Sequence, residues 1–411
     1  MTTDYKPRLR FFADASGQRH IAAEDHYLYR RATPDYRVGI IGTGTIGQEH
    51  MRVTRLLGRA TIAGIYDASP LSMQVALEND PGGTDTPPVV WQSLADAKAA
   101  TDVDAWFICT PNDTHHDVLI SMMETGKPIF VEKPMATTLA DAAAMVLAVE
   151  AYPAFVQIGL QYRYKAPYVE ARHEAFVRRS LGDIRTVSMC EYRPPFLDKV
   201  GQWNKFSERS GGTLVEKCCH YFDLMNLFAG AHATRVYASS GQAHNFVEFE
   251  HSGQRSDIDD HAYVVVDYAN GVRGNFTLNM FAPMFHEELI LTGAGGRLTA
   301  TERFDFHRQA VAESSVSVEC DEPHASRTTV LDYPAVIDQS GHHGATYFEH
   351  MAFYDQLDGK AAECATPLEG LWSVIVAAAA QHSSETGAAV DIADFLHQHQ
   401  LAAVVAPAGE S

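Results

Sequence analysis

The stretch Val38-Gly39-Ile40-Ile41-Gly42-Thr43-Gly44-Thr45-Ile46-Gly47 decides the fold of this chain. It places a Gly-x-Gly-x-x-Gly turn directly after a short apolar strand and at the start of a helix. In such a turn Gly42 permits the tight bend, Gly44 lets the backbone approach a pyrophosphate, and Gly47 lets the helix and the strand pack closely. Glycines also occur in ordinary turns, so the strand and helix around them are what make the pattern informative.

Two further features of this segment indicate a bound dinucleotide. The first helical residues, Thr45 and Ile46, offer free N–H groups and the positive end of the helix dipole to phosphates. The carboxylate of Asp67 ends the second expected strand twenty residues past Gly47, where an acid accepts hydrogen bonds from the ribose 2′-OH. Such an acid would repel a 2′-phosphate, and no Arg follows in Ala68-Ser69-Pro70 to receive one. We therefore expect NAD rather than NADP.

Short apolar runs alternate with helical stretches on both sides of this turn. The expected strands are 38–41, 61–66, 105–109 and 128–131, and the expected helices are 46–57, 93–100, 116–124 and 139–152. This alternation predicts βαβ units with right-handed crossovers, and hence a doubly wound parallel sheet.

Beyond about residue 160 the pattern changes. The expected strands are 186–192, 235–240, 262–268, 272–280 and 287–291, and the expected helices are 167–178, 214–228, 345–357 and 368–383. Asn270-Gly271 separates two of the strands and supplies the positive φ angles of a tight hairpin. We expect an N-terminal arm over 1–36, a Rossmann domain over 37–158, and an α+β domain with a largely antiparallel open sheet over 159–411, whose last helix returns to the first domain.

Composition excludes several classes of function. The chain has 411 residues, 46% hydrophobic and 20% charged, which is long enough for two cores. A formal net charge of -20 would repel a polyanion, so nucleic acid is not an expected partner. No apolar run approaches the roughly 18 residues of a membrane span. The N-terminal residues are too polar for a signal peptide, and we expect a soluble, cytoplasmic protein.

The order of three motifs identifies a resemblance. The glycine turn is followed by Thr110-Pro111-Asn112-Asp113-Thr114-His115 and then by Glu132-Lys133-Pro134. In order and spacing they resemble the Gfo/Idh/MocA oxidoreductase family over most of the chain. The resemblance implies that Thr110, Asn112, His115 and Glu132 border the cofactor, and that Lys133 contacts both nicotinamide and substrate. On spacing alone, Lys133 is equally compatible with a surface lysine in a turn set up by the proline.

A second signature reads Gly211-Gly212-Thr213-Leu214-Val215-Glu216-Lys217-Cys218-Cys219-His220. Family members typically have Asp-x-x-x-His here, both facing the substrate, and this chain departs from the pattern because Glu216 replaces the Asp. If the segment is one helix, Glu216 and His220 lie on one face. The resemblance implies that His220 accepts the hydroxyl proton, a task that suits a group whose ordinary pKa is near 6.5. The alternative is that His220 is a hydrogen-bonded histidine of the core without a catalytic role.

Further candidates lie in the second domain. Arg163 and Tyr164 occur where the family often places substrate contacts, and a loop before the second signature combines aromatic and cationic residues that suit a sugar face with an anionic substituent. The loop candidates are Lys199, Trp203, Asn204 and Arg209. The alternative for the loop is a surface segment anchored by its Trp.

Neither the cysteines nor the paired histidines indicate a metal site. The cysteines lack CxxC spacing, so reduced thiols are expected; they are Cys109, Cys190, Cys218, Cys219, Cys320 and Cys364. His342-His343 and His115-His116 are accompanied by no convergent acid or thiol spacing, and we expect no metal.

The resemblance implies an NAD-dependent dehydrogenase that takes hydride from a secondary carbinol carbon of a sugar, cyclitol or glycoside. Two alternatives stay open. Some relatives cleave glycosides by transient oxidation, elimination and re-reduction with NAD recycled, and the family fold also serves as a non-catalytic nucleotide sensor. Relatives commonly pair through the exposed sheet of the second domain, so a homodimer or homotetramer is expected.

Overall fold

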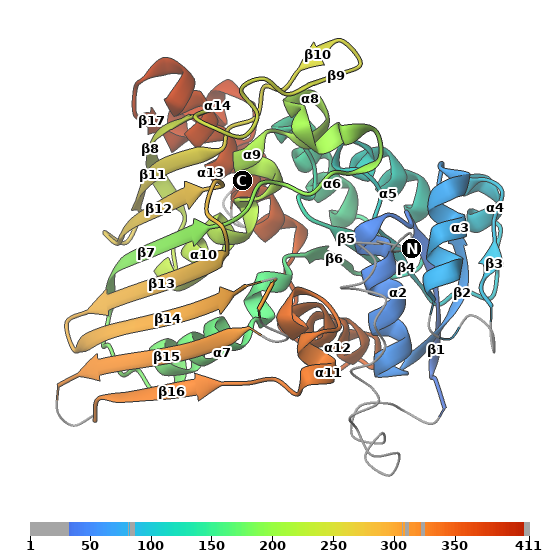
Figure 1. The fold of residues 1–411 in the computed structure, drawn as a ribbon, viewed down its shortest axis with the longest axis horizontal. Helices are drawn as coiled ribbons and strands as arrows, with labels where there is room; N and C mark the ends of the chain where they lie inside the picture. The colour runs from blue at the N-terminus through green and yellow to red at the C-terminus, as the bar shows by residue number, and fades with distance from the viewer. Residues whose placement is uncertain are drawn as a thin grey trace, which may run out of the picture.

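The structure is a computed structural model that describes residues 33–80, 82, 87–305, 307–308, 312–321 and 325–406. The expected N-terminal arm lies outside the described residues except for 33–36. Two sheets with their helices make up the molecule, as Figure 1 shows.

The first sheet is parallel and has the strand order β3-β2-β1-β4-β5-β6. Its strands are β1 (Tyr36–Ile41), β2 (Ala60–Tyr66), β3 (Val89–Val90), β4 (Ala105–Ile108), β5 (Ile129–Glu132) and β6 (Val156–Gly159). Its helices are α2 (Thr45–Leu57), α3 (Pro70–Asn79), α4 (Leu94–Lys98), α5 (His115–Met123) and α6 (Leu139–Glu150). The order reverses between β1 and β4, and in doubly wound folds ligands bind outside the carboxyl ends of the strands at such a point.

The second sheet has nine strands in the order β16-β15-β14-β13-β7-β12-β11-β8-β17. They are β7 (Ile184–Tyr192), β8 (Ala233–Gly241), β11 (His261–Tyr268), β12 (Arg273–Asn279), β13 (Phe285–Gly293), β14 (Gly296–Phe304), β15 (Glu313–Cys320), β16 (Arg327–Leu331) and β17 (Val390–Asp391). Only β7 and β12 pair in parallel; every other pair in this sheet is antiparallel. The predicted fold class is therefore confirmed.

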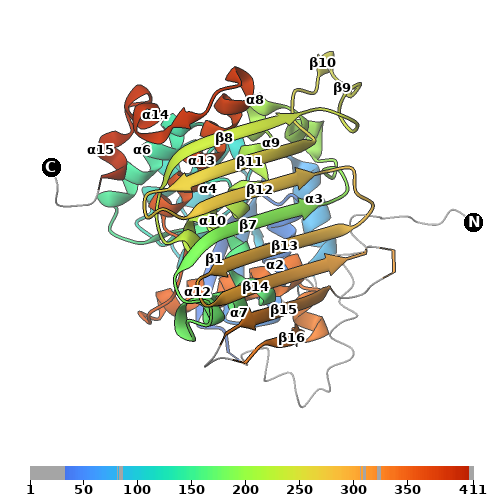
Figure 2. The same ribbon diagram turned by 90° about the vertical axis from the view of Figure 1, so that its left-hand side faces the viewer.

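Helices cover one face of this sheet and leave the other open, as Figure 2 shows. The helices of this part are α7 (Ala166–Arg172), α8 (Ser207–Ser210), α9 (Thr213–Glu216), α10 (Cys219–Ala229), α11 (Ala335–Asp338), α12 (Ala345–Leu357), α13 (Pro367–Thr386), α14 (Ile392–Gln398) and α15 (Ala402–Val405). Buried and exposed residues alternate along β11, as expected of a strand with one covered face. A two-stranded ribbon, β9 (Glu250–His251) with β10 (Gln254–Arg255), lies apart from both sheets.

Two helices of the C-terminal half pack on the Rossmann domain. α13 packs against α6 on one side of the parallel sheet and against β8 and α10 of the second domain. α12 packs against α2 on the other side, where Tyr347, Phe353 and Tyr354 join a core with Val38 and Ile40 of β1. The cofactor helix α2 is therefore in direct contact with a segment of the second half of the chain.

Three local expectations were wrong. The expected helix 214–228 is two helices, since the turn widens at Lys217 and Cys218, whose N–H groups both donate to the Thr213 carbonyl at 3.0 and 3.4 Å. The expected helix 167–178 ends its regular part at Arg172 and continues as a π-helical turn. In the hairpin between β11 and β12 positive φ angles were expected at Asn270 and Gly271, but only Gly271 has one, +88°. Asn270 stabilises the turn through its side chain, which accepts the N–H of Val272.

Candidate functional site

The glycine turn between β1 and α2 is built for close backbone contacts. A Cβ atom at Gly42 (φ +93°) would lie 2.5 Å from the backbone of Cys109, and one at Gly47 would lie 2.0 Å from the carbonyl oxygen of Gly42. A Cβ at Gly44, in contrast, would meet no atom of the described residues within 4 Å. The N-terminus of α2 has no side-chain cap, so its N–H groups next to Gly44 are available to an anion. This geometry fits a pyrophosphate.

The carboxylate of Asp67 is fixed beside this turn. Oδ2 accepts the backbone N–H of Thr43 at 2.7 Å, and Oδ1 accepts that of Ser69 at 2.8 Å. The Thr43 hydroxyl also donates to Oδ2, at 3.4 Å. A carboxylate has about four lone-pair positions, so capacity remains for a ribose hydroxyl.

The turn after β4 is held by its own polar groups. The Thr114 hydroxyl donates to Thr110 Oγ1 at 2.8 Å, and Asn112 Nδ2 donates to the Ser210 carbonyl at 3.3 Å, which links the turn to the second domain. The ring nitrogens of the fully buried His115 lie 2.8 Å from the Pro134 carbonyl and 3.0 Å from the Thr110 carbonyl. Both nitrogens therefore face backbone carbonyls, and the single N–H of the neutral ring donates to one of them, which positions the turn. The contact with the cofactor expected of His115 stays a prediction.

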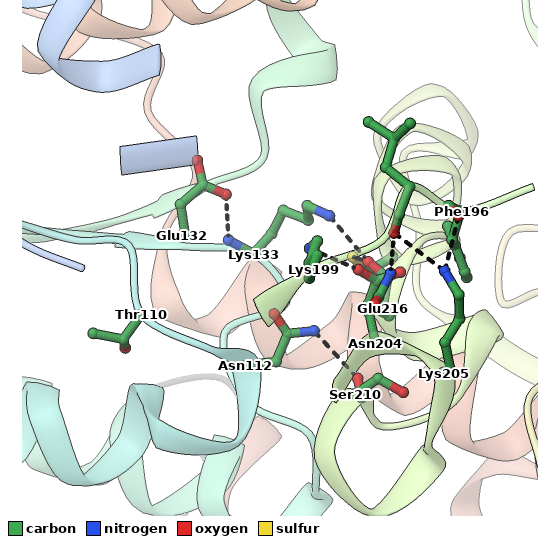
Figure 3. A network of polar contacts seen from close by, with 12 residues as sticks. Thr110, Asn112, Glu132, Lys133, Phe196, Lys199, Asn204, Lys205, Ser210 and Glu216 are labelled. Atoms are coloured by element: carbon green, nitrogen blue, oxygen red, sulfur yellow. Dashed lines mark hydrogen bonds and ion pairs between the residues drawn. The ribbon is translucent and has the colours of Figure 1, made fainter. Parts of the chain in front are cut away.

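Lys133 joins the two domains (Figure 3). It directly follows β5, and its Nζ donates to the backbone carbonyl of Glu216 at 3.1 Å. Glu132 before it is buried, with Oε1 2.8 Å from His50 Nε2 and Oε2 accepting the Lys133 N–H at 3.0 Å. Burial alone would raise the pKa of Glu132, but the hydrogen bond and charge of His50, with the charge of Lys133, lower it. Glu132 thus fixes the backbone from which Lys133 extends.

Glu216 ends α9 and is 4% exposed. Oε1 accepts a hydrogen bond from Lys199 Nζ at 3.3 Å, while Oε2 is buried and has no partner among the described residues. Burial would raise the pKa of this carboxyl, but Lys199, Lys133 and Arg193 lower it, so Glu216 is ionised. One oxygen of a charged carboxylate remains to bind a hydroxyl.

The break between α9 and α10 explains the contact with Lys133. In a continuous helix the Glu216 carbonyl would accept the N–H of His220. Because the helix is interrupted at Lys217 and Cys218, that carbonyl accepts the Lys133 amine instead. Glu216 and His220 were expected on one face of a continuous helix. They instead lie on either side of the break, at the end of α9 and near the start of α10.

His220 is buried, and its ring stacks on Tyr162 with centroids 4.0 Å apart and planes 7° from parallel. Its Nδ1 has no partner among the described residues. Burial, with the charges of Lys133 and Lys217 next in weight, lowers the pKa of this imidazole well below its ordinary value. His220 is therefore neutral at physiological pH and able to accept a proton.

The candidate side chains in the loop before α8 mostly contact other protein groups. Lys199 Nζ lies 4.4 Å from the centroid of the Trp203 ring, which is 8% exposed. Asn204 Nδ2 donates to the Leu197 carbonyl at 2.9 Å, and Arg209 pairs with Asp113 at 2.9 Å. Of the four loop candidates only Lys199 reaches Glu216. Asn204 and Arg209 thus make contacts within the protein, but Asn204 Oδ1 is buried without a partner among the described residues. A substrate contact at either residue stays a prediction.

Arg163 and Tyr164 also make their hydrogen bonds within the protein. The buried Arg163 donates to both carboxylate oxygens of Asp223, at 2.7 and 2.5 Å, and pairs with Glu369 at 3.0 Å. The Tyr164 hydroxyl donates to the Glu363 carbonyl at 2.7 Å. Protein acceptors thus hold these donors, and a substrate contact at Arg163 or Tyr164 stays a prediction.

The sequence did not single out Tyr162, which precedes them. Its ring lies between His220 and two ammonium groups, with Lys165 Nζ 4.1 Å and Lys217 Nζ 4.6 Å from the ring centroid, and its hydroxyl accepts from Lys217 at 2.5 Å. The aromatic pair in Gln161-Tyr162-Arg163-Tyr164 was the available signal. The sequence-based prediction named Arg163 and Tyr164 of this run instead.

The other motifs give no metal site. Each of the six cysteines has a free thiol. His342 pairs with Glu49 and His343 with Asp338. Within the described ranges no three His, Cys, Asp or Glu residues are grouped so that they could hold a metal ion. Of the helices in those ranges, none combines the length and the apolar character needed to cross a membrane.

Comparisons with solved structures show the same fold. A putative myo-inositol dehydrogenase from Sinorhizobium meliloti 1021 superposes with a TM-score of 0.68 at 21% identity, over 87% of this chain and 99% of the other. Levoglucosan dehydrogenase in complex with NADH and levoglucosan gives 0.71 at 19% identity, over 87% and 99% of the two chains.

Curated relatives match over part of their length. Rhizopine catabolism protein MocA of Rhizobium meliloti is 27% identical over 207 residues, which is 50% of this chain and 61% of the relative. Inositol 2-dehydrogenase of Rhizobium meliloti (strain 1021) is 27% identical over 206 residues, 50% of this chain and 58% of the relative. The chain thus spans about three fifths of these relatives.

Family models cover both domains. The model described as an oxidoreductase family with an NAD-binding Rossmann fold matches residues 36–160, and the model of the C-terminal alpha/beta domain of the same family matches 174–392. The second match alone covers more than half of the chain. The glycine turn, the reversal of strand order and these matches agree, and the chain belongs to the Gfo/Idh/MocA oxidoreductases, with an NAD-binding Rossmann domain.

Proposed function

We propose that this protein is an NAD-dependent dehydrogenase that oxidises a secondary carbinol of a cyclitol, sugar or glycoside. The observation that carries the proposal is the convergence of an amine, an ionised carboxylate and a neutral imidazole from both domains. These groups are Lys133, Glu216 and His220. One amine donor and one neutral base suffice to deprotonate an alcohol and stabilise the developing alkoxide.

The cofactor groups follow from the same geometry. The pyrophosphate binds at the glycine turn against the N–H groups of Thr45 and Ile46, and Asp67 accepts the ribose hydroxyls. Thr110 and Asn112 border the cofactor from the turn after β4. When bound, NAD supplies the hydride acceptor, and the protein orients it.

Each of the three groups has one role toward the substrate. His220 accepts the hydroxyl proton, and Lys133 donates a hydrogen bond to the same oxygen as negative charge develops there. The free Oε2 of Glu216 accepts a hydrogen bond from a neighbouring hydroxyl and orients the ring. Lys199 holds the other oxygen of Glu216, so the carboxylate keeps its direction.

The test is absorbance at the NADH band when purified protein and NAD are offered inositols, aldoses and glycosides, with released sugar assayed in parallel. We expect stoichiometric NADH that is lost in Lys133→Ala and His220→Ala. Sugar release without net NADH would instead establish an oxidation-assisted glycosidase. If neither NADH nor released sugar is detected although the protein binds NAD, a non-catalytic sensor would be favoured.

We further propose that two or four copies assemble through the open face of the second sheet. That face exposes large apolar side chains, including Tyr237, Tyr263 and Val265 at 47, 63 and 48%. Monomers rarely expose extended apolar surface. Light scattering during gel filtration gives the mass, and a Tyr263→Lys, Val265→Lys variant should shift it to the monomer.

A further inference from the structure

A second histidine, on the short turn between α11 and α12, is prepared for acid–base work. His342 Nδ1 lies 2.7 Å from Glu49 Oε1, and the Thr346 hydroxyl donates to the same oxygen at 2.5 Å. Burial alone would raise the pKa of Glu49, but the charge and hydrogen bond of His342, with Arg52 and Thr346, lower it to about 2. Glu49 is therefore a carboxylate that fixes the orientation of the imidazole, as in carboxylate–histidine pairs of enzymes.

The backbone around His342 is held in an uncommon conformation. His342 and His343 have φ angles of 43° and 53°, which residues with a side chain rarely adopt. Arg52 of α2 donates through Nε to the Ser340 carbonyl at 2.7 Å. A Cβ at Gly341 would lie 2.3 Å from the Glu49 carboxyl. Such strain persists only where the surroundings impose it, and here α2 of the cofactor domain does so.

His342 belongs to the same electrostatic neighbourhood as the proposed base. Its ring centroid lies 6.3 Å from that of Tyr162, whose face is stacked on His220. Its charge contributes to the lowered pKa values of both His220 and Glu132. The ionisable groups that interact with His342 are thus Glu49 of α2, Glu132 of β5 and His220 of α10.

The two histidines differ in their exposure to solvent, and this difference matters for the proton that His220 accepts. His220 is 1% exposed and surrounded by ammonium groups, so a proton that it accepts must leave before the next turnover. The His342 side chain is 32% exposed, and its Nε2 has no hydrogen-bond partner in the part of the chain that the structure describes. One imidazole is therefore isolated from solvent, and the other is open to it.

We propose that His342, oriented by Glu49, is a second acid–base residue that carries the proton from His220 to solvent. This inference rests on the proposed dehydrogenase function. The proton of the substrate hydroxyl passes to His220 as the hydride leaves the carbinol carbon. His220 then returns to its neutral form by giving up one proton, through ordered water, to Nε2 of His342. His342 keeps its Nδ1 proton on Glu49 and releases the Nε2 proton to bulk water, so one proton leaves per hydride transferred.

The test compares His342→Asn with His343→Asn. Asparagine tolerates positive φ and retains a donor for Glu49, so the loop can keep its shape. We expect His342→Asn to lower kcat by about 10²-fold or more in weak buffer and imidazole to restore it in proportion to its concentration. NAD affinity, measured by fluorescence, should stay unchanged. His343, which faces Asp338 and Phe304, is the matched control, expected within about twofold of wild type.

A Glu49→Gln variant gives a second readout. Without the carboxylate the imidazole loses its fixed orientation, so kcat in weak buffer should fall and added imidazole should restore it, while the NAD dissociation constant stays unchanged. A His342→Asn enzyme with wild-type kcat, or one whose loss imidazole does not repair, would overturn the relay while leaving the dehydrogenase intact. Absence of NADH formation by the wild-type protein on every polyol would overturn the proposed function and this inference with it.

Discussion

The amine nitrogen of Lys133 lies 3.1 Å from the backbone carbonyl oxygen of Glu216, across the junction of the two domains. The lysine follows β5 of the Rossmann sheet, whereas the carbonyl is exposed by the break between α9 and α10. One hydrogen bond therefore sets the position of the proposed alkoxide donor relative to the second domain. Loss of this amine should affect both catalysis and the placement of the substrate.

Lys133→Met keeps the aliphatic stem and removes the amine. We expect kcat to fall by about 10²- to 10³-fold, the usual cost of removing one donor to a developing oxyanion. Steady-state NADH formation measures this, with the NAD dissociation constant as a check on folding. Lys127→Met, six residues earlier and ahead of β5, is the control. An enzyme that retained a tenth of its kcat without the amine would rule out this role.

Gly44 and Gly47 should respond differently to alanine. At Gly47 the new Cβ would lie 2.0 Å from the Gly42 carbonyl oxygen, so Gly47→Ala must displace helix α2 from the turn. Overpacking of this kind costs about 1–3 kcal/mol, and thermal unfolding should show it. At Gly44 the space is open, so Gly44→Ala should unfold like wild type yet bind NAD at least about tenfold more weakly, since the methyl group occupies the expected pyrophosphate position.

The opposite pattern, a destabilised Gly44→Ala with normal NAD affinity, would contradict the placement of the cofactor. Calorimetry with and without NAD separates the two effects, because a bound ligand raises the melting temperature only if it binds the variant.

Asp67 should set the preference between NAD and NADP. Asp67→Ser removes the negative charge next to the expected ribose 2′ position but keeps a polar group for the N–H groups of Thr43 and Ser69. We expect KM for NAD to rise by about tenfold and the ratio of kcat/KM for NAD over NADP to fall. Initial rates with each cofactor measure the ratio. A ratio that does not change would remove Asp67 from the ribose site.

Much of the fold could be predicted because its signals are local. The apolar runs of β1, β2, β4 and β5 are each a short continuous segment, and their alternation with helical stretches indicates parallel strands. The short β3 and β17 have two residues each, too few for any period to show. β15 was missed because serines alternate with its buried valines and lower the apolar content on which the prediction depended.

The site could be predicted only in part because its contacts are distant in sequence. Lys133 and Glu216 are 83 residues apart, and the helix break that joins them has no local signal. Arg163 and Asp223 are 60 residues apart, so an arginine in the expected place gave no sign that its donors were already taken. His342 and Glu49 are 293 residues apart, which is why a histidine pair between glycines could be tested only as a metal motif.

The pair of Arg163 and Asp223 makes a prediction that separates folding from binding. Removing one partner of a buried ion pair leaves an uncompensated charge and typically costs about 3–5 kcal/mol. Arg163→Met should therefore lower the free energy of unfolding in urea, while the remaining folded enzyme keeps its KM for substrate. A raised KM with unchanged stability would instead support Arg163 as a substrate contact.

Stability should fall as the solution becomes mildly acidic. Burial lowers the pKa values of His115, His220 and His350 in the folded protein, so these imidazoles stay neutral below the ordinary value of about 6.5. The unfolded chain binds those protons as the pH falls through about 6.5, which shifts the equilibrium toward unfolding by about 1.4 kcal/mol per pH unit for each histidine. The stabilisation is therefore present above pH 6.5 and is lost below it.

Urea unfolding at pH 7.5, 6.5, 6.0 and 5.5 measures this dependence. His220→Asn removes one of these groups and should reduce the slope below pH 6.5 by about 1.4 kcal/mol per pH unit, with the largest relative gain at pH 5.5. His251→Asn, at an exposed position of β9, is the control and should leave the slope unchanged. A free energy of unfolding that stayed constant between pH 7.5 and 5.5 would show that these imidazoles can be protonated in place, and His220 would then not be held neutral for the proton transfer proposed for it.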